Sequence, residues 1–358
     1  AMIKHKDHFH GSDLEKIEQI YGIRKEEIVS FSANVNPLGV SPLLRTALSE
    51  QIDVITTYPD REYTSLRKCI AEYCGTEYEN VIVGNGSTEL ISLFIQIEHP
   101  KKAMVIGPTY SEYEREISLG GGTTLYYPLR EKDNFRLDVD DFISHLNESI
   151  DLIVICNPNN PTSSCITRTE MRHILDACKE HDIYVMVDET YVEFADNMAD
   201  ISAVPLTNYY NNIVILRGTS KFFAAPGLRL GYGFCSDKKL IETMEQMRQP
   251  WSVSTAAQEA GVAAIQETDR VEKTRRYVAK ERRWMERQME RLGISYIPSE
   301  VNFMLFRGRE DLWERMLEQR ILIRDCSNYD GLSKGDYRVA VRTREENVRL
   351  FQALTEVV

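Results

Sequence analysis

The residue whose neighbours best suit covalent chemistry is Lys221. It lies in the segment 218–223, GTSKFF, between small hydroxyl residues and two aromatic residues. Such neighbours favour burial of the amine, which lowers its pKa and makes the neutral form available to attack a carbonyl group. A lysine on a solvated surface stays protonated and cannot attack a carbonyl group. From the segment 218–223 alone, Lys221 could also be such a surface lysine.

Three further polar segments could act with this lysine. The segment 84–89, GNGSTE, is a glycine-rich turn before a helical pattern, and its free N–H groups could bind an anion. The segment 157–162, NPNNPT, is a loop that two prolines make rigid. Asp188 ends an apolar run, and a carboxylate buried there needs a cationic or N–H partner. Each segment alone could also be an ordinary turn or a helix cap.

Taken together, the four segments supply what pyridoxal 5'-phosphate requires. A lysine forms a Schiff base with its aldehyde, and an aspartate faces its ring nitrogen. An asparagine and a tyrosine hold its ring hydroxyl, and a helix N-terminus with nearby serine and arginine holds its phosphate. All four segments follow runs that we expect to be strands, so the sequence predicts one cofactor site.

The apolar runs before these segments predict a parallel sheet. Runs at 81–84, 103–106, 151–156, 183–187 and 213–216 alternate with helical patterns, among them 87–97 and 169–180. Short strands that are apolar throughout are typical of a parallel sheet covered by helices on both faces. Ligands of such sheets bind beyond the carboxyl ends of the strands, where the polar segments lie.

The pattern changes after about residue 240. A long charged helix is expected at 266–292, followed by strands at 302–306, 321–323 and 337–341 with helices between them. We therefore predict an α/β fold with two domains. The large, cofactor-binding domain spans 33–240 and has a mainly parallel sheet. A smaller α+β domain combines 1–32 with 241–358.

Composition excludes several classes of function. The 358 residues include 43 Lys and Arg against 55 Asp and Glu, a net charge of −12, which argues against nucleic acid as a partner. No apolar run approaches the ~20 residues that span a bilayer. The seven cysteines include no CxxC pair, which indicates reduced thiols in a cytoplasmic protein. Three histidines near the start have no partner at ligand spacing, so no metal is expected.

The chain resembles the fold-type I pyridoxal-phosphate enzymes of the aspartate aminotransferase superfamily over nearly its whole length. Within it, the chain resembles the histidinol-phosphate aminotransferases and, more closely, the L-threonine O-3-phosphate decarboxylases of cobalamin biosynthesis. The segments that carry the closer resemblance are 31–39 (FSANVNPLG), 250–253 (PWSV), 321–329 (ILIRDCSNY) and 337–342 (YRVAVR).

This resemblance implies roles for individual residues. Lys221 should form the Schiff base, and Asp188 should pair with the ring nitrogen. Tyr191 and Asn160 should contact the ring hydroxyl, and Tyr110 should stack on the ring. The residues expected at the cofactor phosphate are Gly86, Ser87, Thr88, Ser220 and Arg229.

The resemblance also implies a homodimer with shared active sites, in which Tyr58 reaches the cofactor phosphate of the partner subunit. Two positions depart from the family pattern. Ser163 stands where the family usually has glycine, and Gly218 stands where it usually has serine.

Substrate binding is expected to depend on arginines near two of the predicted strands. Alternation along a strand would place Arg338 and Arg342 on one face, where they could bind an anion. With Arg324 they suggest a substrate that carries a phosphate besides its carboxylate. His10 and Asn36 are further candidates. Charges on a solvated edge strand are the simpler alternative.

Three functions remain open from the sequence. The first is decarboxylation of a phosphorylated amino acid, L-threonine O-3-phosphate, to aminopropanol phosphate. The second is transamination of histidinol phosphate or a related amino acid. The third is a non-catalytic sensor of pyridoxal phosphate, against which the intact Lys221, Asp188 and Arg338 argue. The sequence does not distinguish serine phosphate from threonine phosphate, which differ by one methyl group.

Overall fold

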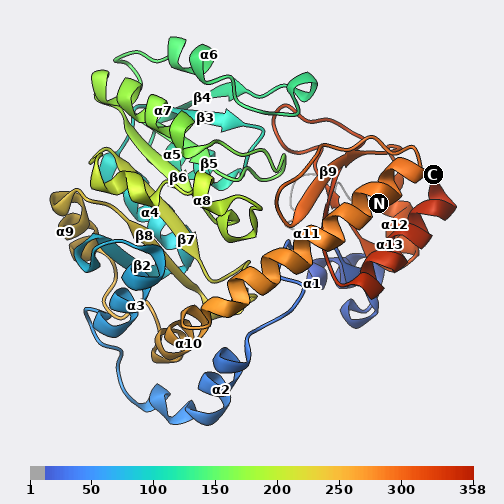
Figure 1. Cartoon of the computed structure of the whole chain (residues 1–358), viewed down its shortest axis with the longest axis horizontal. Coiled ribbons are helices and arrows are strands. Elements are labelled where there is room, and N and C mark those ends of the chain that lie inside the picture. The colour runs from blue at the N-terminus through green and yellow to red at the C-terminus, as the bar shows by residue number, and fades with distance from the viewer. Residues whose placement is uncertain (1–12) are drawn as a thin grey trace.

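The computed structural model describes residues 13–358, and a seven-stranded sheet forms its centre (Figure 1). The strand order is β2-β8-β7-β6-β5-β3-β4. The strands are β2 (Val81–Asn85), β3 (Lys102–Gly107), β4 (Thr123–Pro128), β5 (Leu152–Cys156), β6 (Tyr184–Asp188), β7 (Ile213–Gly218) and β8 (Leu230–Phe234). β8 alone runs in the direction opposite to the other six strands. The predicted mainly parallel α/β sheet is therefore confirmed.

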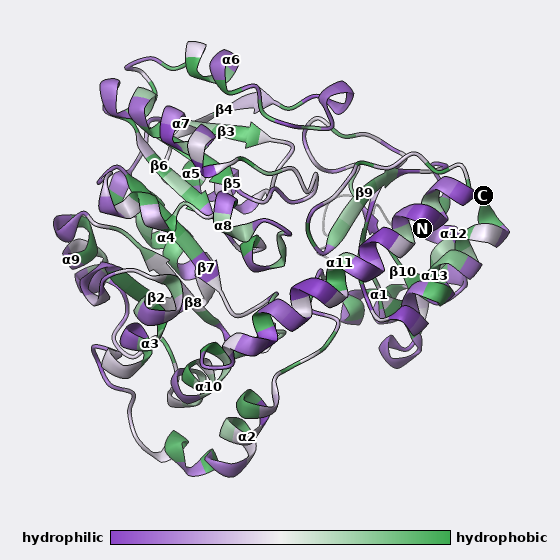
Figure 2. Cartoon of the chain, in the orientation of Figure 1, coloured by the Kyte–Doolittle hydropathy of each residue, from purple (hydrophilic) through white to green (hydrophobic). Residues whose placement is uncertain are grey.

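Both faces of this sheet are buried. In β5, Val154 belongs to one apolar cluster, whereas Ile153 and Ile155 belong to the other. The first cluster contains side chains of α4 (Gly86–Glu98), α5 (Glu112–Leu119) and α9 (Lys238–Met247). The second contains side chains of α3 (Thr64–Cys74), α7 (Arg168–Glu180) and α10 (Thr255–Ile265). Helices on both faces explain why the inner strands β3, β5 and β6 are mostly apolar, as their green colour in Figure 2 shows, whereas β4 at the edge is paler.

The C-terminal part forms a second group of elements, beside the large sheet in Figure 1. Its antiparallel sheet has the order β11-β12-β9, from β9 (Phe303–Arg307), β11 (Arg324–Asp325) and β12 (Asp336–Ala340). A separate parallel pair joins β1 (Val29–Ser30) to β10 (Ile321–Leu322). The helices of this part are α11 (Thr268–Arg291), α12 (Leu312–Glu318) and α13 (Arg344–Val357). The division into 33–240 and 1–32 with 241–358 remains our proposal.

The remaining helices are short. The α-helices are α1 (Leu14–Tyr21), α2 (Pro42–Glu50), α6 (Val139–Ser144) and α8 (Met198–Ile201). The 3₁₀ helices are η2 (Lys25–Glu27), η3 (Ile52–Thr56), η4 (Tyr78–Asn80), η5 (Glu131–Asp133), η6 (Val192–Phe194), η7 (Val204–Asn208) and η8 (Pro226–Leu228). No helix within 13–358 has the length and apolar character needed to cross a membrane.

Candidate active site

A cavity of about 410 Å³ lies where the carboxyl ends of the parallel strands face the C-terminal sheet. Residues that follow β3, β5, β6 and β7 line one side of it, and residues of β11, β12 and the loop between them line the other. The predicted site residues that it brings together are Tyr110, Asn160, Tyr191, Lys221, Arg324 and Arg338.

Lys221 lies in this cavity with its amine directed at the backbone of the N-terminal segment. Its Nζ donates a hydrogen bond to the carbonyl oxygen of Ala33 at 2.8 Å. Burial lowers the pKa of Lys221 to about 8, and the positive charges of Arg338 and Arg229 act in the same direction. A substantial share of the amine is therefore neutral near pH 8, as attack on a carbonyl requires.

Asp188 ends β6 and is buried, with 4% of its surface exposed. Its Oδ2 accepts a hydrogen bond from the Tyr113 hydroxyl at 2.5 Å. Its Oδ1 accepts from the backbone N–H and the hydroxyl of Thr190, at 3.0 and 2.5 Å. No lysine, arginine or histidine within residues 13–358 forms an ion pair with it. A buried carboxylate with only neutral donors fits the protonated ring nitrogen of pyridoxal phosphate.

The turn that opens α4 forms a narrow cradle with Arg229. The Arg229 Nη2 donates to the Thr88 hydroxyl at 3.2 Å. Gly86 has a φ of +77°, and a Cβ built on it would lie 2.3 Å from that nitrogen. A Cβ on Gly231 would lie 2.2 Å from the backbone nitrogen of Ser87. Only glycines fit these contacts, and they keep the N–H groups of the turn close to the guanidinium, which suits a phosphate.

Arg338 projects from β12 into the cavity and is 4% exposed. Its Nη1 donates to Asn160 Oδ1, and its Nη2 donates to the carbonyl oxygen of Ser32 at 2.7 Å. Its Nε is buried without a hydrogen-bond partner, and no carboxylate pairs with the guanidinium in the described part of the chain. A buried cation without a counter-ion is unfavourable, so this geometry favours an anionic ligand beside it.

Arg324 enters the same cavity from β11. Its guanidinium lies 5.3 Å from the ring centroid of Tyr329, and its Nη1 donates to the carbonyl oxygen of Asp325 at 2.6 Å. Because β11 and β12 pair with Arg324 opposite Arg338, the two cations reach one side of the cavity. An antiparallel register across two strands, rather than alternation along one strand, brings the two arginines together.

The structure does not bring Arg342 or Asn36 to the cavity. The strand β12 ends at Ala340, so the expected alternation from Arg338 does not continue to Arg342. Instead, Arg342 bonds the carbonyl oxygen of Val35 at 3.1 Å and lies 3.6 Å from a Glu346 oxygen. The side chain of Asn36 is buried and donates to the carbonyl oxygen of Phe222 at 2.7 Å. Arg342 and Asn36 are thus not part of the cavity wall, and an anion-binding role for Arg338 together with Arg342 stays a prediction.

The remaining predicted residues within 13–358 are not part of the cavity wall. Ser220 precedes Lys221 in the same loop. The Tyr58 ring is 79% exposed and lies 4.8 Å from the Trp251 ring, and Tyr58 is not part of the cavity wall. His10 lies outside the described residues. Ser163 has a φ of +64°, a backbone conformation that favours the glycine usual in the family.

Sequence reasoning missed two residues that hold the predicted ones in place. Tyr113, which bonds Asp188, lies 75 residues away in the sequence. Asn34, whose Nδ2 lies 3.4 Å from the Tyr191 hydroxyl, has a φ of +55°. A helical pattern gives no sign that a tyrosine points at a distant carboxylate. The SANVNP segment contains Asn34, but the role of the side chain depends on the tertiary contact.

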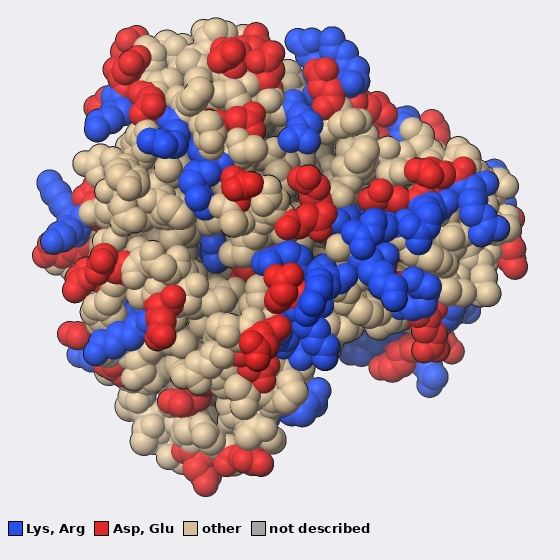
Figure 3. Space-filling view, in the orientation of Figure 1, with Lys and Arg blue, Asp and Glu red and all other residues tan. Residues whose placement is uncertain are grey.

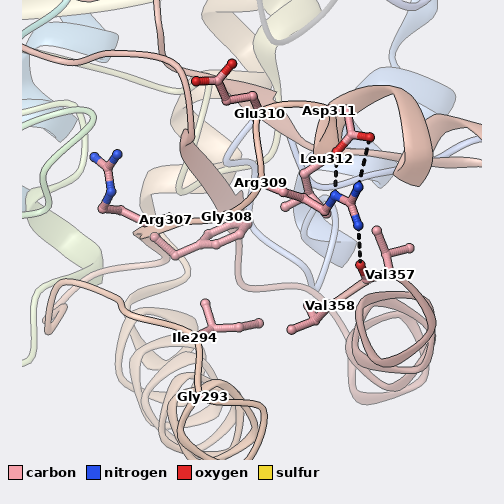
Figure 4. Close-up of a pocket in the computed structure, with 11 residues that line it drawn as sticks. Gly293, Ile294, Arg307, Gly308, Arg309, Glu310, Asp311, Leu312, Val357 and Val358 are labelled. Carbon is pink, nitrogen blue, oxygen red and sulfur yellow. Dashed lines mark hydrogen bonds and ion pairs between the residues drawn. The ribbon is translucent and has the colours of Figure 1, made fainter.

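A second cavity of about 500 Å³ lies between β9, α12 and the end of α13 (Figure 4). It contains none of the predicted site residues. Arg309 pairs with Asp311 at 2.5 Å, and its Nη1 donates to the carbonyl oxygen of Val357 at 3.4 Å. Since this arginine is neutralised locally, the cavity lacks the unpaired buried cation that distinguishes the first.

Known proteins resemble this chain along most of its length. The family model described as aminotransferase class I and II matches residues 26–354. A protein of Caldanaerobacter subterraneus, provisionally named threonine-phosphate decarboxylase, is 37% identical over 90% of this chain and 88% of its own. The threonine-phosphate decarboxylase of Salmonella typhimurium is 34% identical over 98% and 96%.

A solved structure agrees with the family match. The histidinol-phosphate aminotransferase of Clostridium acetobutylicum superposes with a TM-score of 0.86 at 30% identity, over 91% of this chain and 98% of that one. The predicted fold and superfamily are confirmed. The chain belongs to the aminotransferase class I and II family of pyridoxal-phosphate enzymes.

Proposed function

We propose that this chain decarboxylates L-threonine O-3-phosphate to aminopropanol phosphate, a reaction of cobalamin biosynthesis. The observation that carries the proposal is the buried guanidinium of Arg338, which has no carboxylate partner within 13–358 and has Arg324 beside it. Two cations on one side of a cavity suit the doubly charged phosphate group of a phosphorylated substrate. The relatives named threonine-phosphate decarboxylase support the same substrate.

The residues around the cavity fit the cofactor. Lys221 would hold it through its amine, Asp188 would pair with its ring nitrogen, and Asn160 and Tyr191 would contact its ring hydroxyl. The residues proposed for its phosphate are Gly86, Ser87, Thr88, Ser220 and Arg229. When bound, pyridoxal phosphate supplies an electron sink for the pair left at the substrate Cα after a bond there breaks.

Side chains of this protein would determine which bond at the substrate Cα breaks, and Lys221 would transfer the proton. If Arg324 and Arg338 fix the phosphate, the carboxylate is not held and can leave as carbon dioxide. If Arg338 fixes the carboxylate, the carboxylate stays bonded to Cα and the α-proton is lost instead. The Lys221 amine, with its pKa lowered to about 8, can hold and release a proton near neutral pH.

The test follows the products. With L-threonine O-3-phosphate, we expect the enzyme to release carbon dioxide and aminopropanol phosphate without a keto acid, as measured by mass spectrometry. The Lys221→Ala variant should lose both the product and the visible absorbance of the bound cofactor. Conversion that requires a keto acid, with no carbon dioxide released, would contradict decarboxylation.

One observation favours a second function, transamination of histidinol phosphate. The acidic residues Glu112, Glu114 and Asp330 line the same cavity as the arginines. A substrate with a phosphate at one end and an imidazolium at the other would meet charges of opposite sign at both ends. Turnover of histidinol phosphate with 2-oxoglutarate, at a higher kcat/KM than for phosphothreonine, would establish this alternative.

We further infer a homodimer whose subunits share active sites, with Tyr58 contributed across the interface, and a cytoplasmic location. Support for the dimer comes from the exposure of Tyr58, together with that of Ile52 and Ile55 of η3, which are 58% and 62% exposed. Apolar side chains so exposed on one short segment suit burial against another subunit. The free state of all seven cysteines is consistent with a reducing compartment.

A further inference from the structure

The outer face of α11 carries a straight row of basic side chains, which we call the α11 basic row. Its members are exposed: Lys273, Arg276, Lys280, Arg283, Arg287 and Arg291. Their spacing of three or four residues places them within about 80° of one another around the helix axis, along ~27 Å of helix. Figure 3 shows Lys and Arg side chains gathered along α11 on the visible surface.

These side chains differ from the other basic residues of the same helix. Arg282 is buried, forms an ion pair with Asp196 and donates to the carbonyl oxygen of Val301 at 2.8 Å. Arg275 donates to the carbonyl oxygen of Glu193 at 3.1 Å. Both therefore help to attach α11 to the rest of the molecule.

The row itself has no such internal partners. Within residues 13–358, its only side-chain hydrogen bond joins Arg291 to Gln288 at 3.2 Å, and no carboxylate pairs with any member. The apolar contacts of α11 come from its opposite side, where Val278, Met285 and Met289 are buried. Folding and packing thus make no use of the row.

Within the row, neighbouring charges are unfavourable for the helix, although the exposed Glu272 and Glu290 lie four residues from Arg276 and three from Arg287. Like charges three or four residues apart repel one another and destabilise a helix. The chain has a net charge of −12, so a general excess of basic residues does not explain the arrangement. A surface role that requires several cations in line accounts for both features.

The surroundings of the row decide which kind of partner fits. None of the exposed large apolar side chains in 13–358 belongs to α11, so the row lacks the apolar groups that insert into a membrane. The negative net charge opposes a long polyanion such as nucleic acid. A short acidic protein segment, in contrast, interacts mainly with the row itself because salt screens the more distant charges.

We propose that the α11 basic row is a docking surface for an acidic helical segment of another protein. A helix with Asp or Glu every three or four residues presents anions at the same intervals as the cations of the row. This role is separate from the proposed catalytic function, because none of the row residues lines the active-site cavity.

The test uses the complete enzyme loaded with pyridoxal phosphate and a fluorescent helical peptide with glutamates at every third and fourth position. The same peptide with glutamines is the probe control. The variant is Lys280→Gln/Arg283→Gln/Arg287→Gln. A matched variant removes three exposed cations outside α11, Lys101→Gln/Lys238→Gln/Lys239→Gln. Unchanged turnover by both variants shows that they are folded.

We expect the row variant to bind the acidic peptide about tenfold more weakly than the matched variant at low salt, since three exposed ion pairs are lost. The glutamine peptide should not bind. Equal binding by the two variants would overturn the proposal. So would row-dependent binding of a DNA duplex or of phosphatidylserine vesicles that exceeds peptide binding, or row-dependent self-association in sedimentation.

Discussion

At the scale of single residues, two cations of the active-site cavity have no ion-pair partner within 13–358, although acidic residues also line the cavity. Arg338 is buried without a carboxylate partner in 13–358, and it shares the cavity with Lys221. Such a site is unfavourable in the folded chain until a ligand supplies anions. Binding of an anionic ligand should therefore stabilise the folded protein. The lowered pKa of Lys221 reflects the same burial and the same neighbouring positive charges.

The first prediction concerns the stability of the cofactor-free protein. Burial lowers the folded-state pKa of Lys221 to about 8, from the 10.5 of a solvated lysine. A lysine with a lowered pKa destabilises the fold when it is protonated, so the penalty is fully present below pH 8 and disappears as pH rises to 10.5. At pH 7, Lys221→Met should stabilise the protein by up to about 3 kcal/mol. Denaturant unfolding should show this gain shrinking towards pH 10.5, and a gain independent of pH would contradict it.

The second prediction separates Arg338 from Arg342. Removing a nearby positive charge favours the protonated amine, so Arg338→Met should raise the pKa of Lys221. Arg342→Met is the matched control, because Arg342 donates to the Val35 carbonyl oxygen and lies 3.6 Å from a Glu346 oxygen outside the cavity. The pH dependence of Lys221 acylation, followed by mass spectrometry in cofactor-free protein, reports each pKa. An equal shift in both variants would mean that Arg338 does not act locally.

At the scale of elements, the strands of the large sheet that are apolar on both faces could be predicted from sequence, whereas the other two strands of that sheet could not. β4 has the sequence TTLYYP and is only partly buried, so its pattern is not that of a buried strand. β8, LGYGF, is buried, but its two glycines hide the strand pattern. Residues that follow β3, β5, β6 and β7 do line one cavity, since parallel strands end at the same edge, whereas the segment 84–89 is not part of its wall. Partners such as Tyr113 depend on helix placement, which no local pattern reveals.

The strands β6 and β7 also carry a buried ion pair next to the active-site residues. Glu189 follows Asp188, and Arg217 precedes Gly218 at the end of β7. The Arg217 Nε lies 3.1 Å from Glu189 Oε1, and their side chains are 2% and 0% exposed. Ser202 bonds both partners, at 2.8 and 3.0 Å. The pair therefore fixes the ends of two strands from which Asp188 and Lys221 extend.

The third prediction tests this pair. Glu189→Gln or Arg217→Met alone should destabilise the protein by about 3–5 kcal/mol, because each leaves a buried group unpaired. The double variant should be more stable than the sum of the two changes implies. Chemical denaturation measures all three. The exposed pair Lys25 and Glu15 is the control, and Glu15→Gln should change stability little. Strict additivity at Arg217 and Glu189 would show that they do not act as a unit.

At the scale of the whole molecule, one residue predicted to bind the cofactor, Tyr58, is not part of the active-site wall within its own chain. Tyr58 is 79% exposed and packs on Trp251 rather than at the cavity. Exposed apolar residues of η3 lie just before it in the sequence. In a symmetric dimer, a residue that is misplaced within its own subunit can complete the site of its partner.

The last prediction tests that arrangement with two inactive variants. Tyr58→Ala and Lys221→Ala are purified separately, mixed and allowed to exchange subunits. A hybrid dimer then has one site with neither defect, formed by Lys221 of one chain and Tyr58 of the other. Random exchange makes half of the dimers hybrid, so activity should return to about a quarter of the wild-type level. Tyr209→Ala removes an equally exposed tyrosine, 74% exposed, and should keep full activity alone. If mass spectrometry of intact dimers shows exchange but activity stays absent, each active site is built within one subunit.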